Sequence, residues 1–202
     1  MARAVYISSV CEGAGKFFLV LGLIDLAVQQ TARVGFFRPV IAGSRLGPRD
    51  RDIEVVLSYF GLEQSYEESF AWTLEEVRSV LASRDGEDKL IERVIERFKT
   101  LQQRFDFIAI EGSDFVGDLA SLEFDFNALI ARNLSIPLVL VGSADLNGPQ
   151  AAVDALQLSV DAAEERGVQV LAVVVNKVRA EERQEIHNRP VSYTHLTLPT
   201  KA

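Results

Sequence analysis

The chain has 202 residues, of which 48% are hydrophobic, and its formal net charge at pH 7 is −8. This length and composition predict one domain with its own core, and the acidic balance without a basic stripe argues against nucleic acid or an anionic membrane as a partner. A single cysteine, Cys11, excludes an internal disulfide, and no apolar run reaches the length of a membrane span, so we expect a cytoplasmic protein.

The first elements are a short apolar strand, a glycine-bearing loop and a long apolar helix, all within residues 4–28. A glycine-rich turn leaves backbone N–H groups unpaired at the start of a helix, where the helix dipole also favours negative charge. Gly13 and Gly15 allow an anion to approach the backbone around Ala14, and Lys16 can neutralise it. The loop therefore predicts a phosphate-binding site.

The loop departs from the usual phosphate-binding pattern G-x-x-x-x-G-K-[ST] at two positions. Val10 stands where the first glycine is expected, and Phe17 stands where a serine or threonine is expected. Only the shorter pattern G-x-G-K remains. A phenylalanine cannot ligate Mg²⁺, so the metal ligand is missing from its usual place. A strand, a tight turn and a helix also occur together without any ligand, which is the alternative interpretation.

The first helix, over residues 16–30, is apolar nearly all round, which predicts burial between the sheet and other elements. A second strand is expected over 33–40, with Pro39 closing its hydrogen-bond ladder. The remaining expected strands are 69–72 (the weakest pattern), 107–110, 137–141 and 168–175. The remaining expected helices are 51–60 (capped by Asp50 and ended by Gly61), 74–82 (opened by a capping box of Thr73 and Glu76), 87–104, 123–134 and 150–166.

Continuous apolar strands that alternate with helices predict a parallel sheet covered on both faces, that is, a doubly wound α/β fold. The residues expected in the buried sheet are Val5, Ile7, Phe36, Ile108, Ile110, Leu138, Leu140, Val170 and Val174. Ligands of such sheets bind beyond the carboxyl ends of the strands. Lys16, Arg38, Glu111 and Asn176 each end or follow a strand, so we expect them to share one site. Each alone could be an ordinary polar strand end.

The last twelve residues, VSYTHLTLPTKA, have no helical period and no charge pattern. We therefore expect a domain over residues 1–190 and an unstructured tail over 191–202 that is foreign to it. His195 in this tail and the solitary His187 are not candidates for catalysis.

Six segments, in their order and spacing, resemble the N-terminal domain of long bacterial phosphate acetyltransferases. That domain is similar in turn to dethiobiotin synthetase, within the P-loop class of ATPases. The resemblance covers about residues 4–186, and EGSDF followed by LEFDFNA is its most specific part. The segments are AVYISSVCEGAGKFFLVLGLIDL, RVGFFRPVI, FDFIAIEGSDF, LEFDFNALIARNL, IPLVLV and VLAVVVNKV.

The resemblance implies a three-layer, P-loop NTPase-like sandwich and a role for each site residue. Lys16 would hold phosphates, Glu111 would help to hold Mg²⁺, and Asn176 would contact a purine. Arg38 stands where the family has a lysine, and it cannot give up a proton. The implied ligand is ATP or another anionic metabolite. Phe17 counts against Mg²⁺, for which Glu111 is the one candidate ligand.

Three functions remain open from the sequence. The first is a metabolite-sensing or assembly domain of a phosphate acetyltransferase, an acyltransferase of acetate metabolism whose catalytic domain nothing in this chain matches. This chain would then be inactive by itself, with the C-terminal transferase domain or a second copy as its partner. The second is an ATP-dependent enzyme of the dethiobiotin synthetase kind, against which Phe17 and Arg38 both count. The third is a partition-type P-loop ATPase or an interaction module.

Overall fold

The structure is a computed structural model that describes residues 2–42, 47–114, 123–145 and 148–182. Its described strands form one sheet in the order β3-β2-β4-β1-β5-β6, and every neighbouring pair is parallel. The strands are β1 (Arg3–Ser9), β2 (Val34–Ile41), β3 (Phe70–Thr73), β4 (Phe107–Glu111), β5 (Leu138–Ser143) and β6 (Val170–Asn176).

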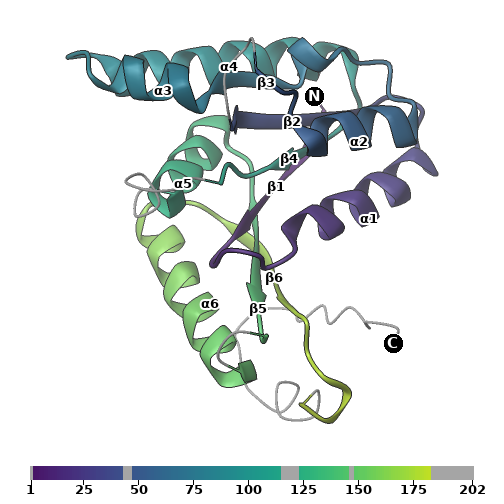
Figure 1. The fold of residues 1–202 in the computed structure, drawn as a ribbon, viewed down its shortest axis with the longest axis vertical. Coiled ribbons are helices and arrows are strands. Elements are labelled where there is room, and N and C mark those ends of the chain that lie inside the picture. The colour runs from purple at the N-terminus through teal and green to yellow at the C-terminus, as the bar shows by residue number, and fades with distance from the viewer. Residues whose placement is uncertain (1, 43–46, 115–122, 146–147, 183–202) are drawn as a thin grey trace.

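Helices cover both faces of this sheet (Figure 1). The α-helices are α1 (Lys16–Val28), α2 (Arg51–Phe60), α3 (Leu74–Leu81), α4 (Gly86–Arg104), α5 (Glu123–Leu134) and α6 (Gly148–Glu165). Two short 3-10 helices, η1 (Tyr66–Glu68) and η3 (Ala180–Glu182), complete the described elements. The predicted doubly wound, parallel α/β fold is therefore confirmed.

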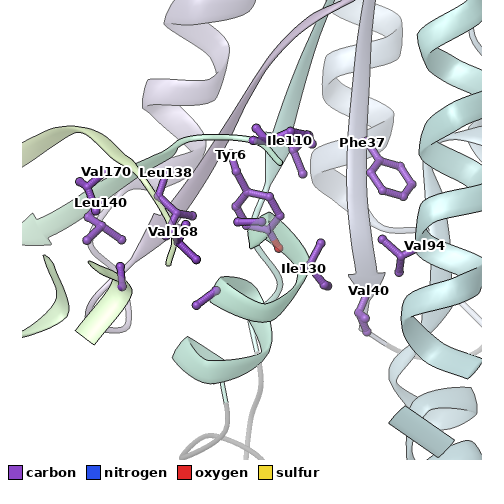
Figure 2. Packing of buried hydrophobic residues seen from close by; sticks show 14 of the residues in the cluster. Tyr6, Phe37, Val40, Val94, Ile110, Ile130, Leu138, Leu140, Val168 and Val170 are labelled. Carbon is purple, nitrogen blue, oxygen red and sulfur yellow. The ribbon is translucent and has the colours of Figure 1, made fainter. Parts of the chain in front are cut away.

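Alternate residues of each strand enter two separate cores, one on each face of the sheet. The core under α1 and α2 takes Ile7 and Phe36, and the core under α3 to α6 takes Tyr6 and Phe37. Figure 2 shows the second core, in which Tyr6 and Phe37 of the sheet point toward the helices that carry Ile130 and Val94. All nine residues predicted for the buried sheet are buried.

Local signals in the sequence explain where the predicted helices begin and end. The Asp50 carboxylate accepts hydrogen bonds from the backbone N–H groups of Asp52 and Ile53 at the start of α2. Gly61 ends that helix in the left-handed region, at φ 60°. Thr73 and Glu76 form the expected capping box of α3. These caps determine the residues at which α2 and α3 begin and at which α2 ends.

Two expectations about the first half of the chain are wrong. The helix α1 is not buried all round, because Phe18 is 74% exposed and Leu26 is 56% exposed. One face of α1 packs on the sheet and no described element covers the opposite face, so apolar composition alone overestimated its burial. Nor does Pro39 end β2: pairing with β4 ends at Phe37, but pairing with β3 continues to Ile41.

The expected tail over 191–202 lies outside the described residues, as do His187 and His195. Among the described helices, none is both long enough and apolar enough to cross a membrane.

Candidate functional site

The loop between β1 and α1 has the backbone shape that its glycines predict. Gly13 and Gly15 have φ values of 67° and 86°, which only glycine adopts without strain. A Cβ atom on Gly15 would also lie 2.5 Å from the side-chain nitrogen of Asn176. The loop therefore needs glycine at position 15 for both conformation and space.

Asn176, the last residue of β6, supports this loop from the side. Its Nδ2 atom donates a hydrogen bond of 2.9 Å to the carbonyl oxygen of Ala14. The resemblance implied a contact between Asn176 and a purine. In the structure the amide is bonded to the loop, so any contact with a base would have to use the rest of the side chain or replace this bond.

Lys16, the first residue of α1, is buried although it carries a charge, with 6% of its surface exposed. Its ammonium group donates a hydrogen bond to the Asp114 carboxylate and lies 4.0 Å from an oxygen of Glu111. Asp114 follows β4 by three residues, and its side chain is half exposed. The cation that the sequence assigns to a phosphate is thus already paired with a carboxylate of the same chain.

Arg38, in β2, is also buried and lies among acidic groups. Its Nη1 atom lies 2.9 Å from the Asp50 carboxylate and 2.8 Å from that of Asp52. Its Nη2 atom lies 3.3 Å from Asp114, and its Nε atom lies 3.7 Å from Glu111. Because four carboxylates surround its guanidinium, Arg38 is already paired within the protein and is not free to bind a ligand.

Within the described part of the chain, this cluster joins two cationic side chains to four acidic ones. Arg38 Nε and Glu111 Oε2 are both buried and make no hydrogen bond in the described structure. Next to the cluster lies a cavity of about 560 Å³ that is lined by the loop, Phe17, Asp52 and Glu111, among others. A cavity beside unsatisfied polar atoms is where a ligand could supply the missing contacts.

Burial changes the acid–base properties of these carboxyl groups. It raises the pKa of Glu111 from 4.5 to about 7, although Arg38 and Lys16 work in the opposite direction. Burial also raises the pKa of Asp52, again against the effect of Arg38. Around neutral pH Glu111 is therefore partly protonated, and the negative charge of the cluster depends on pH.

The described residues do not fit Mg²⁺. Phe17 lies half buried at the rim of the loop cavity, in the place of the usual hydroxyl ligand. No group of three or more histidine, cysteine, aspartate or glutamate side chains in the described ranges could hold a metal ion. Glu111, the predicted metal ligand, faces Lys16 and Arg38 instead. A phosphate fits better, because the loop offers a helix N-terminus and a lysine.

Sequence reasoning found Lys16, Arg38 and Glu111 but missed most of their partners. Asp50 was expected only as a helix cap, and Asp52 and Asp114 were not assigned to the site. These acids come from different connections, so the pairing depends on the order of the strands, which the sequence did not predict. The available signal was that Asp50 begins the helix that follows β2 and that Asp114 follows the end of β4 by three residues, so both lie in connections that leave the carboxyl edge of the sheet.

The raised pKa of Glu111 predicts that the contribution of this residue to the free energy of unfolding falls as the pH rises from about 4.5 to about 7. In this window the folded protein binds a proton that the unfolded chain has lost, so each step up in pH favours unfolding. We expect a loss of about 1–3 kcal/mol in the free energy of unfolding across the window. Urea unfolding of the wild type and Glu111→Gln at several pH values measures it.

The Glu111→Gln variant should show a clearly shallower pH dependence than the wild type, because the titrating group is gone. Glu165→Gln, at an exposed position of α6, is the matched control and should follow the wild type. Parallel curves for the wild type and Glu111→Gln would contradict the assignment.

Comparisons with known proteins agree with this fold. The AAA domain family (AAA_26) matches residues 3–197. The chain is 33% identical over 188 residues to a phosphate acetyltransferase of Nitratidesulfovibrio vulgaris, a match that covers 92% of this chain but only 27% of that protein. The matched region is the N-terminal part of that protein. The chain is also 27% identical to an ATP-dependent dethiobiotin synthetase of Clostridium perfringens, over 88% of this chain and 79% of that protein.

Among solved structures, a plasmid partition protein of Borrelia burgdorferi bound to AMPPNP has a similar fold. The TM-score is 0.59 at 14% sequence identity, and the match covers 99% of this chain and 87% of that one. At this identity the likeness concerns the fold alone.

Proposed function

We propose that this chain is a regulatory or assembly module of a phosphate acetyltransferase and that its loop binds a phosphate-bearing metabolite. The chain belongs to the AAA_26 family of AAA domains, whose model matches residues 3–197. The similarity to the N-terminal part of a phosphate acetyltransferase supports the proposed role. The chain spans about a quarter of that relative's length. The transfer of an acetyl group between coenzyme A and phosphate would then belong to another part of the protein, in the cytoplasm.

The observation that carries this proposal is the pairing of Lys16 with Asp114 at the mouth of the glycine loop. A phosphate that enters the loop competes with Asp114 for the same ammonium group. Asp114 is half exposed, so its carboxylate can move into water at a small cost when it is displaced. Binding thereby exchanges an internal anion for an external one at Asp114, three residues beyond the end of β4.

This exchange is the behaviour of a sensor rather than of a catalyst. ATP turnover needs groups that neutralise the phosphates during transfer, and usually a bridging Mg²⁺. Phe17 stands in place of the usual hydroxyl ligand of Mg²⁺. Arg38 is paired with the carboxylates of Asp50 and Asp52, so it is not free to neutralise phosphates. These features also disfavour an ATP-dependent synthetase of the dethiobiotin kind, despite the similarity in sequence.

Calorimetric titration of inorganic phosphate and of ATP tests the proposal. We expect the wild type to bind at least one of them near millimolar concentration, because the ligand must displace Asp114. Lys16→Ala should lose the binding, whereas Lys99→Ala, at an exposed position of α4, should keep it. ATP turnover should stay far below about 1 s⁻¹ in every variant.

Two outcomes would contradict the proposed function. In the first, Lys16→Ala binds as tightly as the wild type, which removes the loop from the site. In the second, the wild type turns over ATP at ordinary enzyme rates, which makes the chain a catalyst.

A further inference from the structure

A second cavity, of about 350 Å³, lies on the other face of the sheet from α1, between α3, α4 and α5. Its lining is more strongly apolar than that of the loop cavity, and the two cavities share no residue. The volume equals that of roughly a dozen water molecules in the liquid and lies within the range of small-molecule sites. The apolar lining residues are Val77, Leu81, Leu90, Ile91, Phe126, Ala128 and Leu129.

Four charged side chains stand around this apolar lining, and two of them neutralise each other. Arg166 donates a hydrogen bond of 2.6 Å to the Asp125 carboxylate and another of 2.8 Å to the Ala162 carbonyl oxygen. Within the described ranges, the side chains of Arg132 and Glu87 form no hydrogen bond or ion pair. The cavity therefore offers one unpaired guanidinium and one unpaired carboxylate.

The two unpaired groups differ in what they can bind. A guanidinium is weakly hydrated and matches a carboxylate with two parallel hydrogen bonds, and the stem of Arg132 can lie along apolar surface. Arg132 also follows Ala128 and Leu129 by about one helical turn, so it belongs to the wall that these residues form. The Glu87 carboxylate lies in the same lining and repels any further negative charge that a ligand brings beyond the one paired with Arg132.

We propose that this cavity binds a small apolar molecule that carries one carboxylate. The apolar part fills the space above Leu90 and Ala128, and the carboxylate pairs with Arg132. A phosphate monoester, with up to two negative charges, is disfavoured by Glu87. The site lies apart from the glycine loop, so this inference does not depend on the proposed function.

The opposing interpretation is that both charges only complement helix dipoles. Glu87 lies in the first turn of α4 and Arg132 in the last turn of α5, where each is stabilised without any ligand. That interpretation predicts either no binding or apolar binding without preference for charge. Selectivity among ligands with the same chain therefore separates the two.

Titration of octanoate, octylamine and octyl phosphate into the full chain, followed by calorimetry, provides this test. We expect octanoate to bind at least about fivefold more tightly than either of the others. Arg132→Gln should remove that preference, and Leu129→Trp, which fills the cavity, should remove the binding altogether. Arg78→Gln, at an exposed position of α3 outside the cavity, is the matched control and should behave as the wild type.

Any of three results would overturn the proposal: no saturable binding of octanoate at millimolar concentration, octylamine or octyl phosphate bound as tightly as octanoate, or equal affinity of Arg132→Gln and Arg78→Gln for octanoate. Circular dichroism of each variant establishes that it is folded. Because Arg132 is exposed, its replacement leaves the fold intact.

Discussion

Replacement of Arg38 by methionine is expected to lower the free energy of unfolding by about 3–5 kcal/mol at pH 7. The guanidinium is the shared partner of Asp50, Asp52 and Glu111, and the first and last of these are themselves buried. Without Arg38, buried negative charges lose their compensation, which costs more than the pair itself contributes. Urea denaturation of the variant and the wild type at pH 7 measures the difference.

Arg33→Met is the matched control, because Arg33 also pairs with a carboxylate, that of Asp106, but in an exposed position. An exposed pair is screened by water and contributes little, so Arg33→Met should lose far less stability than Arg38→Met. The deficit of Arg38→Met should also shrink as the pH falls below 7, because Glu111 takes up a proton first and the other carboxyl groups follow, which removes the uncompensated charge. A loss no larger than that of Arg33→Met would show that the cluster does not need its guanidinium.

Asn127→Ala is expected to destabilise the fold by about 2–4 kcal/mol. The Asn127 side chain accepts hydrogen bonds from the Tyr6 hydroxyl and from the Ser113 backbone N–H, and it donates to the Ser113 carbonyl oxygen. All of these groups are buried, so alanine leaves several of them without a partner. Thermal and urea unfolding measure the loss.

Asn133→Ala, on the same helix but exposed, is the matched control, since its amide bonds only to a backbone carbonyl of its own helix. It should cost less than about 1 kcal/mol. Similar losses for the two variants would mean that Asn127 does not hold the end of β4 against β1.

The sequence predicted the fold well because its signals are local. Apolar strands, helix caps such as Asp50 and Thr73, and the glycines of the loop act within a few residues of their own position. The neighbourhood of Lys16, Arg38 and Glu111 was also predicted, since the carboxyl ends of parallel strands meet at one edge. The structure brings the two cations within 4.0 Å of Glu111.

The electrostatic state of the site could not be predicted in the same way. It depends on which connections lie next to each other, and the strand order places Asp50, Asp52 and Asp114 around the two cations. Local pattern thus identified a loop suited to phosphate but missed that its lysine is already paired. The exposed face of α1 was missed for a related reason, because composition does not reveal which side of a helix has a neighbour.

The measurement that tests the central claim most directly is the affinity of Asp114→Asn for inorganic phosphate. If Asp114 competes with the ligand for Lys16, the neutral and nearly isosteric asparagine should bind phosphate about 5–10-fold more tightly than the wild type. The double variant with Lys16→Ala should show no such gain. An affinity of Asp114→Asn equal to or weaker than that of the wild type would contradict the claim that phosphate and Asp114 exchange at the loop.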